Sequence, residues 1–318
     1  MNRTTAMAAA PASIGNVAVG FDMMGLAFGV AEDRVTATRT PEPGVRLGAV
    51  GGLVTRLPED PARNTALRAA QAVLGKAGAS FGVVLDVHKG VPMSAGMGGS
   101  AASAVAAALA VNALLPEPVS KGALIAPALE GEAASADPPP LDNVVASLLG
   151  GLCLIRGPQP GDILALPLPE DVDCLLVHPD LKVETQAARD LLSPTVPLET
   201  AVAHARDVAG FVAACFRGDP VLMGETLTDC LVEPQRAPLV PFLQDMQSAV
   251  RAEGALGCSL SGSGPSVFAW APRGRAEAVE RAMIAVMEAF QMGHRFYRAP
   301  LAAPGARLVP TGPHPERG

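Results

Sequence analysis

One segment of the sequence combines closely spaced glycines with the start of a helix, an arrangement that suits the binding of a phosphate chain. Gly96-Met97-Gly98-Gly99-Ser100 leads directly into an alanine-rich run of helix-forming residues. Glycines let backbone N–H groups converge on a ligand, and the first turn of a helix offers unpaired N–H groups and the positive end of its dipole. The segment therefore predicts an anion site, although glycine-rich turns also precede helices that bind nothing.

Two widespread nucleotide motifs offer alternative interpretations of this loop. No stretch of the sequence has the Walker A spacing G-x-x-x-x-G-K-[ST]. The dinucleotide fingerprint G-x-G-x-x-[GA] is matched by Gly96, Gly98 and Ala101, but in that fold the strand runs directly into the first glycine. Here eight residues separate Val87 from Gly96. Neither motif is favoured.

The periodicity of apolar residues predicts the elements that position the loop. Residues 34–39 and 81–87 alternate as strands do, and residues 62–74 have helical spacing with Gly75 as the expected helix end. The alanine-rich helix at 100–115 precedes a helix at 122–134, three prolines at 138–140 and a helix beginning near Asp142. Later strands are expected at residues 152–155, 174–178, 266–271 and 305–310, and later helices at 198–217, 223–232, 239–253 and 276–292.

A stretch dense in proline and glycine at residues 157–169 is the predicted boundary between two α+β domains, residues 1–165 and 166–318. The chain of 318 residues has 49% hydrophobic content, enough for a sizeable core. Its net charge of −7 argues against nucleic acid as a partner. No apolar run reaches the ~20 residues of a membrane span, and the five scattered cysteines suggest buried thiols in a reducing cytoplasm rather than disulfides or zinc.

Three segments, in order, resemble the signature motifs of the GHMP kinases. Residues 11–22 (PASIGNVAVGFD) are similar to the first motif of this family, residues 92–102 to its second, P-x-x-x-G-L-G-S-S-A-A, and residues 260–269 (LSGSGPSVFA) to its third. Together they cover nearly the whole chain. The resemblance implies an ATP-dependent small-molecule kinase with an α+β fold, in which a ribosomal protein S5 domain 2-like N-terminal domain precedes a ferredoxin-like C-terminal domain.

By this resemblance the loop and its neighbours bind ATP and Mg²⁺. Ser100 and Glu132 are the expected metal ligands, and Glu130 is the alternative to Glu132. Asn64 stands where the family places an adenine contact, although the residue alone would suggest a helix N-cap. The full set expected at the nucleotide is Asn64, Pro92, Ser94, Ala95, Gly96, Met97, Gly98, Gly99, Ser100, Ala101, Ser103, Gly262 and Gly264.

Within the family, three further segments are most similar to homoserine kinases: residues 142–151 (DNVVASLLGG), 185–189 (TQAAR) and 233–236 (EPQR). The resemblance implies L-homoserine as the small-molecule substrate. Arg189 and Arg236 would then clamp its carboxylate, since a guanidinium pairs bidentately with a carboxylate. Asn16 and Asp22 would hold its amino group and hydroxyl end. Read alone, the arginines would be solvated helix residues, Asn16 a turn residue and Asp22 a cap.

Phosphoryl transfer depends mainly on positioning and charge neutralisation, so a strong base is not obligatory. We expect Asn143 to orient the attacking hydroxyl. Asp142 stands in the stretch where mevalonate-type relatives have a catalytic base, and whether it acts as one here stays open. A homodimer is possible.

Two departures from the family pattern bear on the substrate. Gly99 replaces the first serine of G-L-G-S-S, and Pro140 stands where homoserine kinases have a histidine. The alternatives are therefore a kinase for another small alcohol such as mevalonate, and a non-catalytic ligand sensor. Asn16 and Asp22, placed for an ammonium group, disfavour mevalonate, and the retained Ser100, Glu132 and Asn143 disfavour a sensor.

Overall fold

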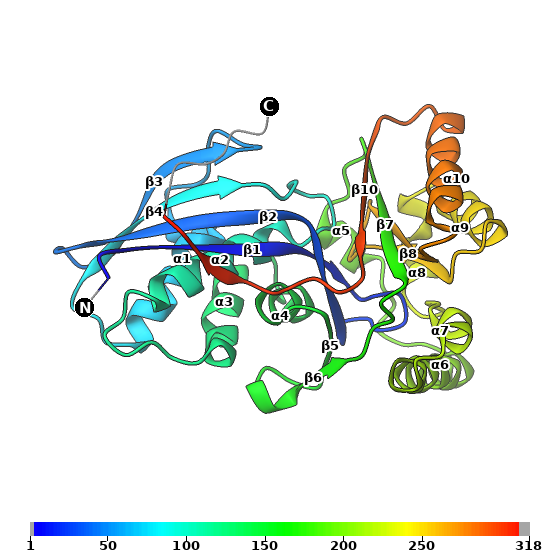
Figure 1. The fold of residues 1–318 in the computed structure, drawn as a ribbon, viewed down its shortest axis with the longest axis horizontal. Coiled ribbons are helices and arrows are strands. Elements are labelled where there is room, and N and C mark those ends of the chain that lie inside the picture. Colours follow the sequence, from blue (N-terminus) through cyan, green and yellow to red (C-terminus); the bar gives the residue numbers. More distant parts are fainter. Residues whose placement is uncertain (1–2, 312–318) are drawn as a thin grey trace.

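Two β-sheets organise the chain, of which the computed structural model describes residues 3–311 (Figure 1). The larger, seven-stranded sheet has the order β11-β1-β2-β4-β3, with β5 paired to β2 and β6 to β5. Its strands are β1 (Thr5–Gly15), β2 (Met24–Thr40), β3 (Val45–Gly52), β4 (Gly82–Lys89), β5 (Leu152–Ile155), β6 (Ile163–Leu166) and β11 (Arg307–Val309).

The long hairpin of β1 and β2 carries the first motif to the junction of the two sheets. The two strands pair antiparallel over their whole shared length, with an irregularity in register between Pro11 and Ala12. The end of β2 pairs with β4 and its beginning with β5. The connection at residues 16–23 therefore lies at the end of the larger sheet that is nearest the smaller one (Figure 1).

Three helices pack on one face of the larger sheet, α1 (Thr65–Lys76), α2 (Gly99–Asn112) and α4 (Leu141–Leu149), and α3 (Ile125–Glu132) packs against these helices. The central one, α2, is buried on nearly all sides, and half of its residues are alanine. A helix surrounded by other elements has no polar face, so its apolar residues follow no helical stripe. Small side chains let the neighbouring helices and the sheet approach α2 closely.

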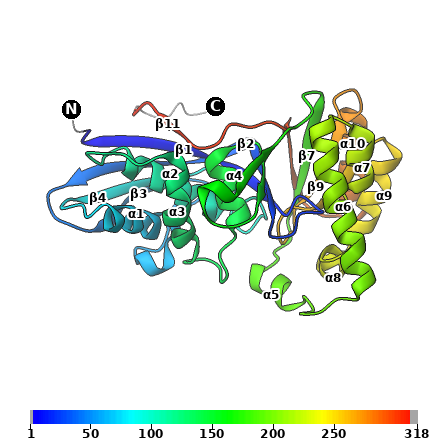
Figure 2. The same cartoon turned by 90° about the horizontal axis from the view of Figure 1, so that it is seen from below.

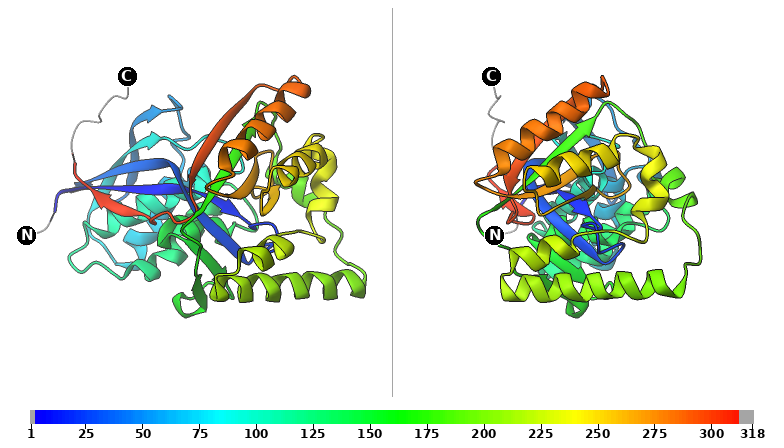
Figure 3. Two further views of the ribbon diagram at one scale, coloured as in Figure 1. Left: turned by 45° about the vertical axis from the view of Figure 1, so that its right-hand side comes forward. Right: turned by 90° about the vertical axis from the view of Figure 1, so that its right-hand side faces the viewer.

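The smaller sheet is antiparallel in the order β10-β7-β9-β8. Alternate side chains of β9 face opposite layers: Ala269 packs in a core with α9 and α10, whereas Trp270 packs against α6, where the ring centroids of Trp270 and Phe211 are 5.9 Å apart. Helices thus cover both faces (Figures 2 and 3). The strands are β7 (Val172–Pro179), β8 (Gly257–Leu260), β9 (Val267–Pro272) and β10 (His294–Pro300), and the helices are α5 (Thr185–Asp190), α6 (Leu198–Arg217), α7 (Pro220–Thr226), α8 (Glu233–Arg236), α9 (Leu243–Ala252) and α10 (Ala276–Ala289).

The chain passes between the sheets twice. It leaves the larger sheet after β6 and returns after β10, so that β11 pairs antiparallel with β1, Met7 opposite Val309 (Figure 2). The division between residues 165 and 166 stays a prediction. Short 3-10 helices complete the connections: η1 (Pro61–Arg63), η2 (Lys121–Leu124), η3 (Pro160–Asp162) and η4 (Ala237–Leu239). Within residues 3–311, none of the helices has the length and apolar character needed to cross a bilayer.

Most of the predicted elements are confirmed, and strand β5 and helix α6 have the expected bounds. The prediction of one helix at 223–232 is wrong: α7 begins at Pro220, after the N-cap Asp219, and ends at Thr226. Gly75 does not end α1, which continues to Lys76. Strands β1, β3, β6, β8 and β10 were not expected. β1 is an almost fully buried, alanine-rich run without alternation, and β3 is rich in glycine and has no buried residue. β6 and β8 have only four residues each, and the alternation in β10 is weak.

A pair of glycine substitutions tests the close helix packing. A Cβ at Gly131 would lie 2.6 Å from the carbonyl oxygen of Thr65 and 2.7 Å from the Cβ of Ala69, so α3 would have to move away from α1. We expect Gly131→Ala to lower the free energy of unfolding by roughly 1–3 kcal/mol. Gly75→Ala, also in a helix but with no atom within 4 Å of the new Cβ, should raise it by about 0.5–1 kcal/mol. Urea unfolding measures both, and a Gly131→Ala variant as stable as the unsubstituted protein would contradict the packing.

Candidate active site

The glycine-rich loop between β4 and α2 packs so closely against two other segments that no side chain fits at Gly96 or Gly98. Gly96 and Gly98 have φ values of 68° and 61°, a left-handed conformation that favours glycine. A Cβ on Gly98 would lie 2.0 Å from Ser13 Oγ, and one on Gly96 would lie 2.4 Å from the carbonyl oxygen of Ser261. Helix α2 begins directly after Gly98, with no side chain capping its first turn. Its first N–H groups are therefore available to an anion.

Hydrogen bonds join the three motif segments at this loop. Ser13 N donates to the carbonyl oxygen of Met97 at 3.0 Å, and Gly262 N donates to that of Gly15 at 3.2 Å. Ser261 Oγ donates to the carbonyl oxygen of Gly96 at 2.6 Å. The segments near residues 13, 97 and 262 thus form one site between the two sheets.

A buried ion pair between Lys89 and Asp33 lies beneath the loop, together with Ser103. Of these three residues, only Ser103 was expected at the site from the sequence. Lys89, the last residue of β4, donates to Asp33 of β2, to the carbonyl oxygen of Gly99 at 2.6 Å and to Ser103 Oγ at 2.9 Å. Ser103 Oγ donates to Asp33 Oδ2 at 2.6 Å. The other carboxylate oxygen of Asp33 accepts the two backbone N–H groups that follow Lys89, both at 3.0 Å.

Every donor of the Lys89 ammonium group is used in this network, and the network fixes both ends of the loop. Asp33 holds the backbone where the loop leaves β4, and Lys89 holds Gly99 where α2 begins. The Ser103 hydroxyl is buried beneath the loop and occupied by Asp33 and Lys89. No local pattern marked the network in the sequence: Asp33 is one of three consecutive charged residues of β2, and Lys89 follows His88 at the end of β4.

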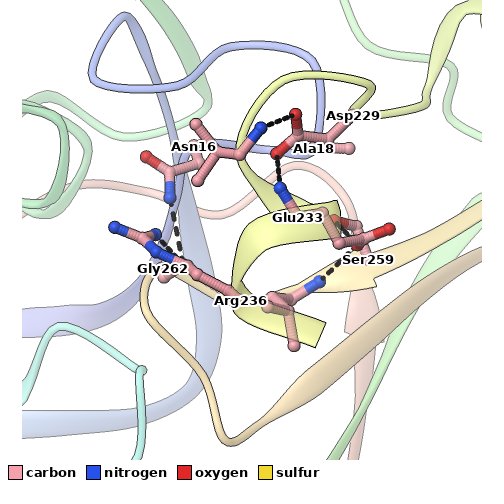
Figure 4. Close-up of a pocket in the computed structure, with 9 residues that line it drawn as sticks. Asn16, Ala18, Asp229, Glu233, Arg236, Ser259 and Gly262 are labelled. Atoms are coloured by element: carbon pink, nitrogen blue, oxygen red, sulfur yellow. Dashed lines mark hydrogen bonds between the residues drawn. The ribbon is translucent and has the colours of Figure 1, made fainter. Parts of the chain in front are cut away.

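The connection after β1 has an unusual backbone. Asn16, Val17 and Ala18 have φ values of 68°, 47° and 55°, and Asp22 has 54°. Non-glycine residues in this region cost roughly 1–3 kcal/mol each and persist only where other contacts impose them. Asn16 supplies such contacts: its Oδ1 accepts Asp22 N at 3.1 Å, and its Nδ2 donates to the carbonyl oxygen of Gly262 at 3.0 Å. Figure 4 shows the bond to Gly262.

The side chains of Asp142 and Asn143, at the start of α4, lie between the loop and this connection. Asp142 Oδ2 accepts Asn16 N at 3.0 Å, and Oδ1 accepts Asn143 N at 2.8 Å and Asn143 Nδ2 at 3.2 Å. Asn143 Oδ1 accepts the Ser13 hydroxyl at 2.9 Å. Burial raises the pKa of the Asp142 carboxyl to about 6. Asp142 therefore ties α4 to the first motif.

Glu132, at the end of α3, carries a buried carboxylate oxygen that lacks a protein partner. Ser100 Oγ donates to Glu132 Oε2 at 2.9 Å, whereas Oε1 is buried without a hydrogen bond. Burial raises the pKa of Glu132 to about 7. Such an orphaned oxygen beside a serine hydroxyl suits a bound cation. Glu130 is exposed and lines a different surface, beside Arg68.

Two arginines and an aspartate gather around Phe21. Arg189 and Asp22 form an ion pair at 3.3 Å, with side chains 29% and 47% exposed. Arg236 is only 4% exposed, and it donates to the carbonyl oxygens of Ala188 and Gly262, both at 3.2 Å. Figure 4 shows its bond to Gly262. The guanidinium carbons of Arg189 and Arg236 lie 5.9 and 5.4 Å from the Phe21 ring centroid. Burial lowers the pKa of Arg236.

Acidic residues orient the short helix α8 that carries Arg236. Asp229 accepts the backbone N–H groups of residues 231–233. Glu233 bonds Ser259 and accepts Gln247 Nε2 at 2.6 Å, which attaches α8 to β8 and α9. A cavity of about 10 Å³ lies beside these residues and Arg236, room for a single water. The sequence motif at 233–236 indicated the arginine but not the groups that fix it.

The structure brings most of the expected residues together, and the side chains of two of them, Asn64 and Ser103, are already engaged in other hydrogen bonds. Asn64 is the N-cap of α1: its Oδ1 accepts Ala66 N and Leu67 N, and its Nδ2 donates to the carbonyl oxygen of Pro58. Ser103 lies beneath the loop, as described above. Pro140 is the N-cap of α4 and makes no side-chain hydrogen bond.

Comparison with known proteins gives a consistent picture. Models of the GHMP kinases N terminal domain and of the GHMP kinases C terminal region match residues 64–151 and 211–289. The chain is 42% identical over 306 residues to the homoserine kinase of Xylella fastidiosa strain 9a5c, covering 96% of this chain and 94% of that protein. It is 38% identical over 315 residues to the homoserine kinase of Chlorobium phaeobacteroides strain DSM 266, covering 94% and 98%.

Among solved structures, the chain is similar to the crystal structure of homoserine kinase from Cytophaga hutchinsonii. The TM-score is 0.91 with 34% sequence identity, and the superposition covers 97% of this chain and 98% of the other. The arrangement of both sheets and their helices is therefore shared over nearly the whole length.

The buried ion pair beneath the loop is testable by stability. Lys89→Met leaves the buried Asp33 carboxylate without its cation, and we expect a loss of roughly 3–5 kcal/mol in the free energy of unfolding. Adding Asp33→Asn should recover part of the loss, because the uncompensated charge is removed. Lys182→Met is the control, since Lys182 pairs with Glu184 on the surface, where the side chains are 70% and 67% exposed; it should cost at most about 1 kcal/mol. Equal losses in the Lys89 and Lys182 variants would refute the role of the network.

Proposed function

The chain belongs to the GHMP kinase family, and from this we infer that it is a homoserine kinase, an ATP-dependent enzyme that phosphorylates the side-chain hydroxyl of L-homoserine. The hydroxyl oxygen forms a bond to the γ-phosphorus of ATP as the bond to the β,γ-bridging oxygen breaks. The hydroxyl proton is lost, and the products are ADP and O-phospho-L-homoserine, an intermediate on the way to threonine. The likeness to homoserine kinases over nearly the full length carries this conclusion.

The loop at residues 96–100 is the proposed site of the ATP phosphates. Its left-handed glycines allow backbone N–H groups to converge on a ligand, and the uncapped start of α2 adds further donors. The Lys89 network holds these donors in place before the nucleotide arrives, so little ordering remains to be done on binding. Asn64 caps α1, and its side chain already accepts and donates hydrogen bonds there. The adenine contact stays a prediction.

Ser100 and Glu132 are the proposed Mg²⁺ ligands. Mg²⁺ takes one or two protein oxygens together with phosphate oxygens and water, which fits a hydroxyl and one orphaned carboxylate oxygen. When bound, the ion would neutralise the negative charge that develops on the phosphates during transfer. Glu132 is favoured over Glu130 because it contacts Ser100 and faces the interior.

For the acceptor, we assign the carboxylate to Arg189 and Arg236 and the ammonium group to Asp22. Arg236 is buried, and no acidic group lies within ion-pair distance of it among the described residues, so a substrate carboxylate would supply the missing counter-charge. Asn16 holds Asp22 in place through its backbone N–H.

Asp142 acts in this proposal as a positioning residue rather than as the base. Both of its carboxylate oxygens accept hydrogen bonds from Asn16 or Asn143, and its side chain is buried. Asn143 retains a second amide hydrogen that could orient the hydroxyl. A free hydroxyl needs no strong base in a loose phosphoryl-transfer transition state. The requirement for ATP and the five free cysteines favour a cytoplasmic location. A homodimer stays a prediction.

An assay of acceptor choice tests the function. ADP release would be measured by a coupled assay with L-homoserine, mevalonate, L-serine and no acceptor. We expect kcat/KM for homoserine to exceed the values for the other two acceptors by at least about tenfold, because they lack either a correctly placed charge or the chain length. Turnover with mevalonate and none with homoserine would replace the proposed substrate.

A matched pair of glutamate variants tests the metal site. Glu132→Gln removes the negative charge from the proposed ligand, so the Mg²⁺ concentration for half-maximal activity should rise at least about tenfold, equivalent to ~1.4 kcal/mol. Glu130→Gln lies two residues away on the exposed side of α3 and should leave the Mg²⁺ dependence unchanged. If the two variants have the same Mg²⁺ dependence, Glu132 is not a ligand.

A further inference from the structure

Two residues proposed to hold opposite ends of the acceptor are paired with each other in the structure. The two terminal guanidinium nitrogens of Arg189 donate to the carboxylate of Asp22 at 3.3–3.4 Å. Both side chains are partly exposed, so the pair is accessible to a ligand and is solvated. Ion pairs of this kind contribute little to stability and are easily opened.

The third charge at this place has no such partner. The Arg236 guanidinium binds only carbonyl oxygens, those of Ala188 and Gly262, among residues 3–311. Both guanidinium groups lie near the Phe21 ring, and Arg189 and Asp22 are close enough to act electrostatically on Arg236. The carboxylates of Asp229 and Asp142 also act on Arg236, but among these carboxylates only that of Asp22 forms an ion pair with an arginine of the described residues.

We propose that the Asp22–Arg189 ion pair is exchanged for ion pairs with a zwitterionic acceptor when the acceptor binds, and that this exchange selects for such an acceptor. When an α-amino acid enters, Arg189 leaves Asp22 and joins Arg236 on the carboxylate, while Asp22 takes the ammonium group. One internal ion pair is replaced by two pairs with the ligand, and no charge is left alone. The proposal rests on the proposed function, because it assumes that the acceptor binds here.

The backbone favours movement of the arginine rather than of the aspartate. Asp22 has a φ of 54° and its N–H is held by Asn16 Oδ1, so its position is fixed by the strained connection. Arg189 lies in the six-residue helix α5 and reaches Asp22 through a long, flexible side chain. Exchange therefore requires only a rotamer change of Arg189.

Exchange penalises an acceptor that carries only one of the two charges. A carboxylate without an amino group draws Arg189 away and leaves Asp22 unpaired next to a second anion. An amine without a carboxylate takes Asp22 and leaves Arg189 unpaired next to a second cation. Selection against mevalonate-like acceptors then comes from the charge left behind and not from shape alone.

Two charge-removing variants and two homoserine analogues test the exchange. The analogues are 4-hydroxybutyrate, which lacks the amino group, and 2-amino-1,4-butanediol, which lacks the carboxylate. Asp22→Asn keeps a side chain that tolerates positive φ. It should lower kcat/KM for homoserine at least tenfold but raise kcat/KM for 4-hydroxybutyrate at least threefold. Arg189→Gln should show the mirror pattern, raising kcat/KM for 2-amino-1,4-butanediol and lowering the values for homoserine and 4-hydroxybutyrate.

The crossed gain separates exchange from simple contact with the substrate. If Asp22 and Arg189 only bound their own ends of the acceptor, each variant would leave the analogue that lacks the corresponding group unchanged, and that result would overturn the proposal. Either variant suffices if the other fails to fold. Asp190→Asn is the control, because Asp190 lies exposed on α5 and accepts Gln186 Nε2 at 2.7 Å; its kinetics should match those of the unsubstituted enzyme. An unsubstituted enzyme inactive on homoserine would instead refute the proposed function.

Discussion

The buried contact between Asp33 and Lys89 is the interaction on which the site depends. An isolated buried charge is costly, and an ion pair compensates only when its remaining donors and acceptors are also satisfied. Here Lys89 reaches Gly99 and Ser103 as well as Asp33, and Asp33 accepts the backbone at the start of the loop. Because the partners lie on two strands and on α2, the pair sets where α2 begins relative to the sheet. The pair therefore also sets the position of the backbone N–H groups at the start of α2, which are the proposed phosphate donors.

A second constraint comes from the close contact of the three motif segments. The glycine at 98 leaves room for Ser13 and Asn143, and the strained connection at residues 16–18 is held by bonds to Asp142 and Gly262. The strain therefore depends on both sheets being in place. These contacts connect the proposed phosphate site to the proposed acceptor site, so the geometry of each site depends on the other.

Charge is distributed unevenly across the site. At the proposed metal end, Glu132 lies beside Ser100 and has one carboxylate oxygen without a hydrogen bond. At the acceptor end, the positive charge of Arg236 has no ion-pair partner within the described residues, while Arg189 and Asp22 satisfy each other. This distribution favours a cation beside Glu132 and a carboxylate beside Arg236, as the proposed function requires.

The sequence by itself determined the family, the fold and the place of the loop, because motifs and periodicity are local patterns. The three segments near residues 16, 98 and 262 could be recognised without knowing that they meet. Only the tertiary structure decided which side chains are already engaged: Asn64 caps α1, Ser103 serves the buried ion pair, and Arg189 is paired with Asp22, 167 residues away in the sequence. Such pairings need two elements brought together by the core, and no residue spacing records them. For the same reason the strands β1, β3, β6, β8 and β10, formed by pairing rather than by a strong local pattern, were missed.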